Sequence, residues 1–179
     1  ELAFVSRHRL YLLRPSGLTG VPLSGRATSP AWSPDGRWLV VTTSPAPPKS
    51  DPYADEPTSV WLVSQAGKPL RKVTPGGAHD ATATWSPRAD RVAVTYRTDR
   101  RYHAVVVDAS GRTTRLAEAV NISGLAWSPD GRRIALGLSR FVRPATRGSW
   151  RSEILVMSAT ARHAHSVARD RGGLYVLAD

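Results

Sequence analysis

The chain has 179 residues, of which 41% are hydrophobic and none is cysteine, and its formal net charge at pH 7 is +11. The absence of cysteine excludes disulfides, thiolate metal ligands and a cysteine nucleophile, and no apolar run approaches the ~18 residues of a membrane helix. The length suits one domain, with enough apolar residues for a core, and the positive charge bears on solubility and non-specific attraction rather than on fold.

The first 25 residues contain two apolar runs, at 1–5 and 10–13, and the second run ends at a turn of small residues. Short apolar runs bounded by turn residues are typical of strands. We predict three strands here. They supply the last three strands of a four-stranded unit whose first strand comes from the other end of the chain, at 171–179.

A Trp-Ser-Pro phrase then occurs three times, and each copy is followed by a second β-rich run. Proline ends the first strand, because it cannot donate to a ladder, and Asp-Gly supplies the turn, because glycine tolerates positive φ. In the middle copy Arg88-Ala89-Asp90 replaces Asp-Gly, so we expect a different turn there. The copies are Trp32-Ser33-Pro34-Asp35-Gly36, Trp85-Ser86-Pro87 and Trp127-Ser128-Pro129-Asp130-Gly131.

The tryptophans of these phrases are 53 and 42 residues apart, and an apolar strand and a more polar one follow each pair of strands. Four-stranded units of about 40–45 residues with a tryptophan signature are typical of propeller blades. The sequence therefore predicts an all-β fold, a β-propeller of about four antiparallel four-stranded blades, as one domain that is either a small closed ring or part of a larger propeller. The predicted blades are 1–25 with 171–179, 28–75, 81–117 and 122–169. We expect Trp32, Trp85 and Trp127 to be substantially buried between blades, and Trp150 to be more exposed.

Two connections are longer than a hairpin requires, the proline-rich segment 44–58 and the segment 139–152. If the strands of a blade are named A to D in chain order, both segments are B–C loops, which lie at the opposite end of the blade from the A–B turns. The B–C loops together carry a net charge of +6, and arginines beside exposed aromatics are enriched at interfaces. The predicted partner-binding residues are Arg97, Arg101, Arg140, Arg143, Arg147, Trp150 and Tyr53. The alternative is that these arginines pair with the acidic residues of 44–58 and that Trp150 only caps a blade.

No pattern for catalysis, a cofactor or a metal is found. A Gly-x-Ser-x-Gly elbow and a phosphate-binding glycine loop are both absent from the sequence. His163 and His165 are two residues apart and share a strand face, but a zinc site needs a third ligand, which their neighbours lack. Asp35 and Asp130 are expected to bond the backbone of their own turns.

The phrase Trp-Ser-Pro-Asp-Gly followed by a strand resembles the TolB-type propeller repeat of bacterial envelope proteins. The likeness is strongest at 31–36 and 126–131 and weaker at 84–90 and 173–179, where Val176 replaces the tryptophan. Similar repeats occur in the propellers of prolyl-oligopeptidase-like enzymes and in actinobacterial LpqB-type lipoproteins. The six blades and separate α/β domain of the TolB family are not visible here.

The resemblance implies a non-enzymatic protein-binding scaffold in the cell envelope, outside the cytoplasm, tethered through a leader that precedes Glu1. We expect an acidic protein partner, no specific nucleic acid, no cofactor, and a monomer or dimer. The alternatives are a regulatory propeller of a prolyl-oligopeptidase-like peptidase and a receptor for anionic polymers.

Overall fold

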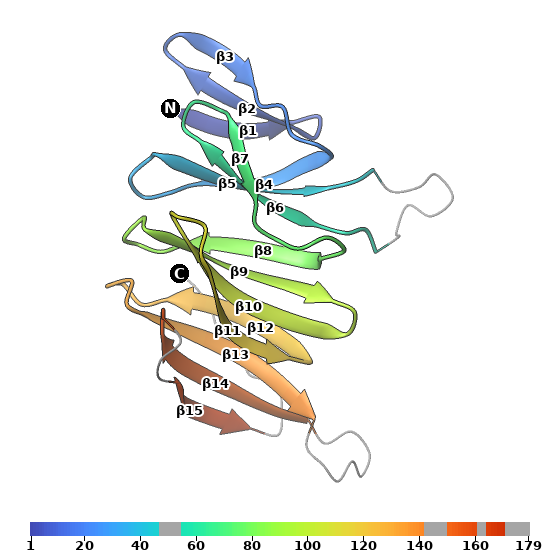
Figure 1. Cartoon of the computed structure of the whole chain (residues 1–179), viewed down its shortest axis with the longest axis vertical. Helices are drawn as coiled ribbons and strands as arrows, with labels where there is room; N and C mark the ends of the chain where they lie inside the picture. Colours follow the sequence, from blue (N-terminus) through green and yellow to red (C-terminus); the bar gives the residue numbers. More distant parts are fainter. Residues whose placement is uncertain (47–54, 142–149, 161–163, 171–179) are drawn as a thin grey trace. The chain divides into compact units, whose positions relative to one another are not determined.

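The computed structural model describes residues 1–46, 55–141, 150–160 and 164–170, and all regular structure in these ranges is β-strand. The strands form one three-stranded and three four-stranded antiparallel sheets, so the predicted all-β class is confirmed (Figure 1). The described part of the chain contains no helix long and apolar enough to cross a membrane. The chain divides into two compact units, Glu1–Trp85 and Ser86–Asp179.

The first sheet has the order β1-β2-β3. Its strands are β1 (Leu2–Ser6), β2 (Arg9–Arg14) and β3 (Gly17–Gly20). Arg7 and His8 both adopt positive φ, of 48° and 62°, and join β1 to β2 in a two-residue turn. The predicted fourth strand of this sheet lies at 171–179, outside the described residues, and so does its predicted pairing with residues 1–6.

The second sheet has the order β4-β5-β6-β7 and contains the first Trp-Ser-Pro phrase between β4 and β5. Its strands are β4 (Arg26–Trp32), β5 (Trp38–Ser44), β6 (Ser59–Ser64) and β7 (Pro69–Lys72). The long connection between β5 and β6 includes 47–54, which lie outside the described residues. The backbone N–H of Gln65, in the β6–β7 turn, donates to the carbonyl of Arg37 in the β4–β5 turn at 2.9 Å.

The third sheet has the order β11-β10-β9-β8 and the fourth the order β12-β13-β14-β15. The boundary between the two units falls between β8 and β9. The strands of the third sheet are β8 (His79–Trp85), β9 (Arg91–Thr98), β10 (Arg101–Asp108) and β11 (Thr113–Ala119). Those of the fourth are β12 (Asn121–Trp127), β13 (Arg133–Phe141), β14 (Trp150–Ser158) and β15 (Ala164–Asp170).

Each unit has its own hydrophobic core, made by side chains that alternate along the strands. In the first unit, Leu10 and Leu12 of β2 pack with Leu39 and Val41 of β5, all at most 1% exposed. In the second unit, Ile134, Leu136 and Leu138 of β13 pack with residues of β10, β11 and β14. The facing sheets within each unit therefore bury their apolar faces against one another, as neighbouring blades do. The single domain remains a prediction.

Candidate functional site

The A–B turns of the second and fourth sheets are closed by the serine and aspartate of the repeated phrase. Asp35 Oδ1 accepts from Ser33 Oγ at 2.6 Å and from the Arg37 N–H at 3.1 Å. In the other copy, Asp130 Oδ1 accepts from Ser128 Oγ at 2.5 Å and from the Arg132 N–H at 3.0 Å. The backbone-bonding role predicted for these aspartates is confirmed.

The middle turn has the same backbone form, so the expectation of a different turn is wrong for the main chain. The N–H of Ala89 donates to the Ser86 carbonyl at 2.9 Å, as Gly131 does to Ser128 at 2.8 Å. Ala89 has a φ of 58°, close to the 64° of Gly131. Only the carboxylate has changed place, because Asp90 lies two positions later and accepts from the Arg91 guanidinium at 2.7 and 2.9 Å.

Hydrogen bonding keeps the turn carboxylates ionised. The serine hydroxyl and then the backbone N–H of the arginine two residues on lower the pKa of Asp35 and of Asp130. Burial works to raise the pKa of Asp90, but the bonds from Arg91 and Ser86 outweigh it, so that this pKa is lowered as well. The recurring aspartates thus stabilise turns.

The repeat tryptophans are partly buried, and none of the three is exposed, in line with the burial predicted from the sequence. Trp32 and Trp127 pack at the margins of the two cores. Trp85 Nε1 donates to the Ala31 carbonyl at 3.0 Å, whereas Trp32 Nε1 is buried and has no hydrogen-bond partner among the residues that the structure describes. The side chain of Trp150 lies outside the described residues.

Of the seven predicted partner-binding residues, the structure describes the side chains of three, all in the second unit. Arg97 Nη1 donates to the Asp99 carbonyl at 3.1 Å. Arg101 Nε lies 4.0 Å from Glu118 Oε1, and the same carboxylate is 3.9 Å from Arg115 and 3.8 Å from His103. The other four predicted side chains, Tyr53, Arg143, Arg147 and Trp150, lie outside the described residues.

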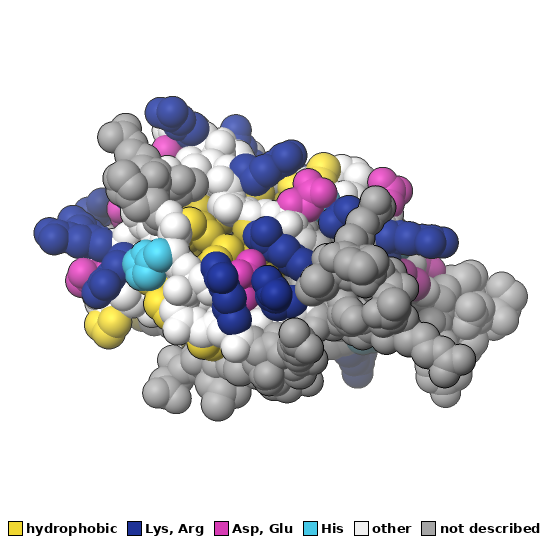
Figure 2. All heavy atoms as spheres, turned by 90° about the horizontal axis from the view of Figure 1, so that it is seen from below, with side chains coloured by type: hydrophobic (Ala, Val, Ile, Leu, Met, Phe, Trp, Pro, Cys, Tyr) yellow, Lys and Arg dark blue, Asp and Glu magenta, His cyan; other side chains and the backbone are white. Residues whose placement is uncertain are grey.

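Arg140 belongs to a second group of charges, centred on Glu153 of β14. Arg140 Nε is 3.4 Å from Glu153 Oε1, and Arg169 Nε is 3.7 Å from Oε2. Glu153 is largely enclosed, with 12% of its side chain exposed, while the two arginines are more than half exposed. Figure 2, seen from below the view of Figure 1, shows dark blue basic side chains beside magenta carboxylates on the face that it draws.

Arg101 and Arg140 are therefore paired with carboxylates of the third and fourth sheets, and the sequence pattern did not indicate these partners. The B–C ends of β9 and β13 carry Arg97 and Arg140, and β10 begins with Arg101. These ends lie on the same side of the second unit, since the A–B turns on the other side are in contact: a Cβ on Gly131 would lie 2.7 Å from Arg88 Cγ. The role of these residues in binding stays a prediction.

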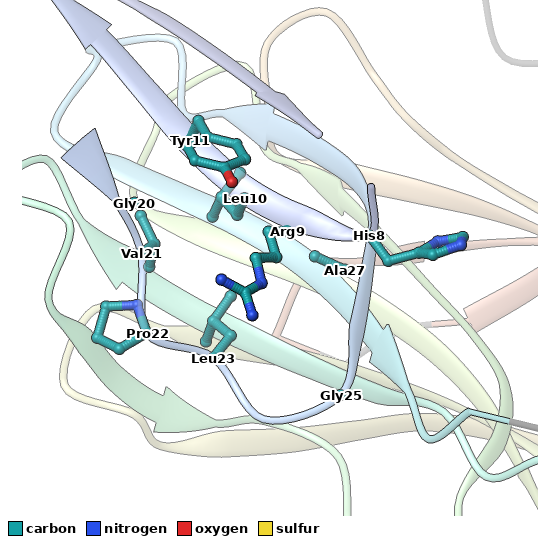
Figure 3. A pocket seen from close by; sticks show the side chains of 10 residues that line it. All are labelled: His8, Arg9, Leu10, Tyr11, Gly20, Val21, Pro22, Leu23, Gly25 and Ala27. Carbon is teal, nitrogen blue, oxygen red and sulfur yellow. The ribbon is translucent and has the colours of Figure 1, made fainter. Parts of the chain in front are cut away.

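Sequence reasoning missed a hollow of about 450 Å³ in the first unit, between the start of β2 and the segment that connects β3 to β4 (Figure 3). Leu10, Val21, Leu23 and Ala27 form its apolar part, and the guanidinium of Arg9 points into it. A smaller hollow of about 280 Å³ adjoins it at Gly25 and includes Trp61 and Lys72. No sequence motif marks either hollow.

A metal centre finds no support in the described ranges, where no three His, Cys, Asp or Glu side chains come together in a way that could hold an ion. His165 is exposed on β15, and His163 lies outside the described residues. His79 Nδ1 instead bonds Asp55 Oδ1 at 3.0 Å.

No protein-family model matches the chain, and no curated protein matches it. Solved structures do. The chain is similar to TolB from Acinetobacter baumannii, with a TM-score of 0.54 and 18% identity over 92% of this chain and 40% of that one. It is also similar to a putative TolB from Agrobacterium tumefaciens, with a TM-score of 0.56 and 22% identity over 93% and 57% of the two chains.

A third similar structure is the tricorn protease, with a TM-score of 0.63 and 19% identity over 92% of this chain and 15% of that one. The chain thus spans well under two thirds of the length of these proteins. At such identities the likeness concerns the fold. Together with the four antiparallel sheets, it identifies the fold as a TolB-like β-propeller of four-stranded blades.

Proposed function

We propose that the chain is a non-enzymatic protein-binding scaffold of the cell envelope, outside the cytoplasm, which binds an acidic partner through the B–C end of its second unit. The observation that supports this most directly is the excess of guanidinium groups over carboxylates there. Glu118 has two arginines and the ring of His103 within 4.0 Å, and Glu153 has two arginines within 3.7 Å.

The charges at this end can be exchanged for those of a partner. Arg101 and Arg140 are 57% and 53% exposed, and exposed ion pairs contribute only about 0–1 kcal/mol. A carboxylate from another protein can therefore take over Arg101 from Glu118 at little cost, whereas Arg140 can bind it through the exposed part of its guanidinium while it stays beside the largely enclosed Glu153. Charge of this kind acts mainly on the rate of association and on its salt dependence.

The test is association kinetics with a short poly-glutamate peptide as the acidic probe. We expect the paired change of Arg101 and Arg140 to Gln to slow association and to flatten its dependence on ionic strength. The matched control changes Arg132 and Arg133, which belong to the A–B turn at the opposite end of β13, and we expect it to have little effect. Equal losses from both pairs would reduce the binding to general attraction by a basic protein.

The envelope location rests on the likeness to TolB structures. Fractionation of cells that express the native gene with an epitope tag tests it. Recovery of the protein with the cytoplasmic fraction would contradict the proposal.

A second candidate is a regulatory propeller attached to a peptidase, which the likeness to the tricorn protease favours. A catalytic α/β domain encoded in the same full-length gene product would support this candidate over the scaffold. Peptide hydrolysis by that product, controlled by removal of the propeller, would then be the measurement.

A further inference from the structure

We propose that the hollow beside β2 is a binding site for a carboxylate carried on an apolar body, such as the last residue of a peptide or a free aliphatic acid. The hollow belongs to the first unit, and the proposal goes beyond the scaffold function, which rests on arginines of the second unit. Its volume of about 450 Å³ lies in the range of ordinary ligand pockets, roughly 300–1,000 Å³.

The polar side of the hollow is provided by Arg9. Its guanidinium points into the space (Figure 3), and Arg9 has no hydrogen-bond or ion-pair partner among the residues that the structure describes. None of the described residues that line the hollow carries a carboxylate. A guanidinium group presents a planar fork of donors that fits a carboxylate in a bidentate manner, so Arg9 is available for a ligand anion.

The neighbouring basic side chains, His8 and Arg26, serve another contact. His8 points away from the hollow (Figure 3), and its ring is hydrogen-bonded by the Arg26 guanidinium. The positive charge inside the hollow is therefore that of Arg9, and a single carboxylate would match it.

Tyr11 lies on the same face of β2 as Arg9, two residues further on, and its hydroxyl is directed toward the arginine side of the hollow (Figure 3). This hydroxyl has no partner in the described part of the chain. Because the ring of Tyr11 stacks on Phe4 with a centroid separation of 5.7 Å, its position is held by packing. The hydroxyl can thus supply one more donor to a bound carboxylate.

The apolar side of the hollow accounts for the body of the ligand. Leu10 and Ala27 are 1% exposed and Val21 is 7% exposed, so they form a fixed floor. Beyond Tyr11 the same face of the sheet continues as a row of leucines, since Leu2 pairs with Leu13 and Leu13 with Leu18. These three are 46–57% exposed, and they offer apolar surface to a ligand longer than the hollow.

Calorimetric titration with two probes tests the site and distinguishes its two sources of ligand. One probe is an N-acetylated tripeptide that ends in leucine with a free carboxylate, and the other is octanoate. We expect saturable binding of at least one of them, and tighter binding of the tripeptide would identify a peptide end as the ligand. The tripeptide with an amidated end should bind at least tenfold more weakly, because it lacks the charge that Arg9 meets.

Single substitutions separate the contributions of Arg9, Tyr11 and the apolar space to the binding affinity. Arg9→Gln should weaken binding at least tenfold and Tyr11→Phe a few-fold, while Arg7→Gln is the matched control, since Arg7 is an exposed arginine two residues away that does not line the hollow. Gly20→Leu keeps both donors and fills the space beside Tyr11, so it should also abolish binding. Far-ultraviolet circular dichroism confirms that each variant is folded.

Three results would overturn the proposal: no saturable binding of either probe, equal affinity for the amidated tripeptide, or equal losses from Arg7→Gln and Arg9→Gln. The arginines of the second unit are unchanged in all these variants. Failure here therefore leaves the poly-glutamate experiment unaffected, and the two proposals fail separately.

Discussion

Ala89 adopts the left-handed backbone conformation that Gly131 adopts at the same position of the next repeat, with φ values of 58° and 64°. A residue with a side chain loses roughly 1–2 kcal/mol of folding free energy in this conformation. Glycine avoids this loss, but it lowers the stability by about 0.4–1 kcal/mol because its unfolded chain has more conformational entropy. We expect Ala89→Gly to stabilise the protein by about 0.5–1 kcal/mol, measured as the free energy of unfolding in urea. A loss of stability would mean that the turn at Ala89 is not strained.

The reverse substitution should depend on the space around each glycine. A Cβ on Gly36 meets nothing within 4 Å, one on Gly131 comes within 2.7 Å of the flexible Arg88 side chain, and one on Gly25 comes within 2.6 Å of the Ser44 carbonyl oxygen. All three have positive φ, so alanine would be strained by the backbone conformation at each position, and only the contacts of its Cβ would differ. The loss of unfolding free energy on change to alanine should therefore increase in the order Gly36, Gly131, Gly25, and any other order would contradict these contacts.

Two tryptophans differ in whether the indole N–H is satisfied. Trp85→Phe removes a 3.0 Å hydrogen bond to Ala31, whereas Trp32→Phe removes a buried N–H that has no partner in the described part of the chain. Since an unsatisfied buried donor costs about 1–3 kcal/mol, we expect Trp32→Phe to be less destabilising than Trp85→Phe by about 1–2 kcal/mol. Thermal unfolding of both variants measures the difference, and equal losses would show that packing alone decides.

The turn aspartates should make stability depend on acidity. The pKa values of Asp35 and Asp130 are lowered in the folded protein, so their contribution is complete above the unfolded value of about 3.9 and is lost as the pH falls through the lower folded values. The temperature at the midpoint of thermal unfolding should therefore decrease once the pH is below about 4. The double change of Asp35 and Asp130 to Asn should lower the midpoint at pH 7 and make the acid-induced fall shallower, and an unchanged pH profile would contradict this role.

The sequence predicted the strands well because their signals are local. The prolines of the Trp-Ser-Pro phrase follow the ends of β4 and β12, and a short apolar run is recognised without knowledge of a distant partner, so the printed residues predict the hairpins around Trp32 and Trp127. The turn at Ala89 was judged wrongly for the opposite reason. Its backbone is held by the hydrogen bonds from the Ser86 N–H to the Arg91 carbonyl and from the Ala89 N–H to the Ser86 carbonyl, which outweigh the preference of one alanine.

The candidate sites were harder to predict because they depend on contacts between strands distant in sequence. Local charge indicated that Arg101 and Arg140 were available, but their partners Glu118 and Glu153 come from other strands of the same sheets. The hollow at Arg9 forms because the connection from β3 to β4 lies beside β2, and no residue pattern predicts the path of that connection. The ion pairs of these arginines and the hollow beside β2 both arise only when the strands have assembled into sheets.

The bond from Gln65 to Arg37 has a counterpart in the second unit, where the N–H of Ala159 donates to the Arg132 carbonyl at 2.9 Å. In both blades a backbone hydrogen bond thus links the C–D turn to the A–B turn. A label or reporter domain inserted at either C–D turn would have to break this bond. The β9–β10 turn at Asp99 and Arg100 is exposed, so a fluorescent tag inserted there would leave this bond intact but would cover the proposed binding end.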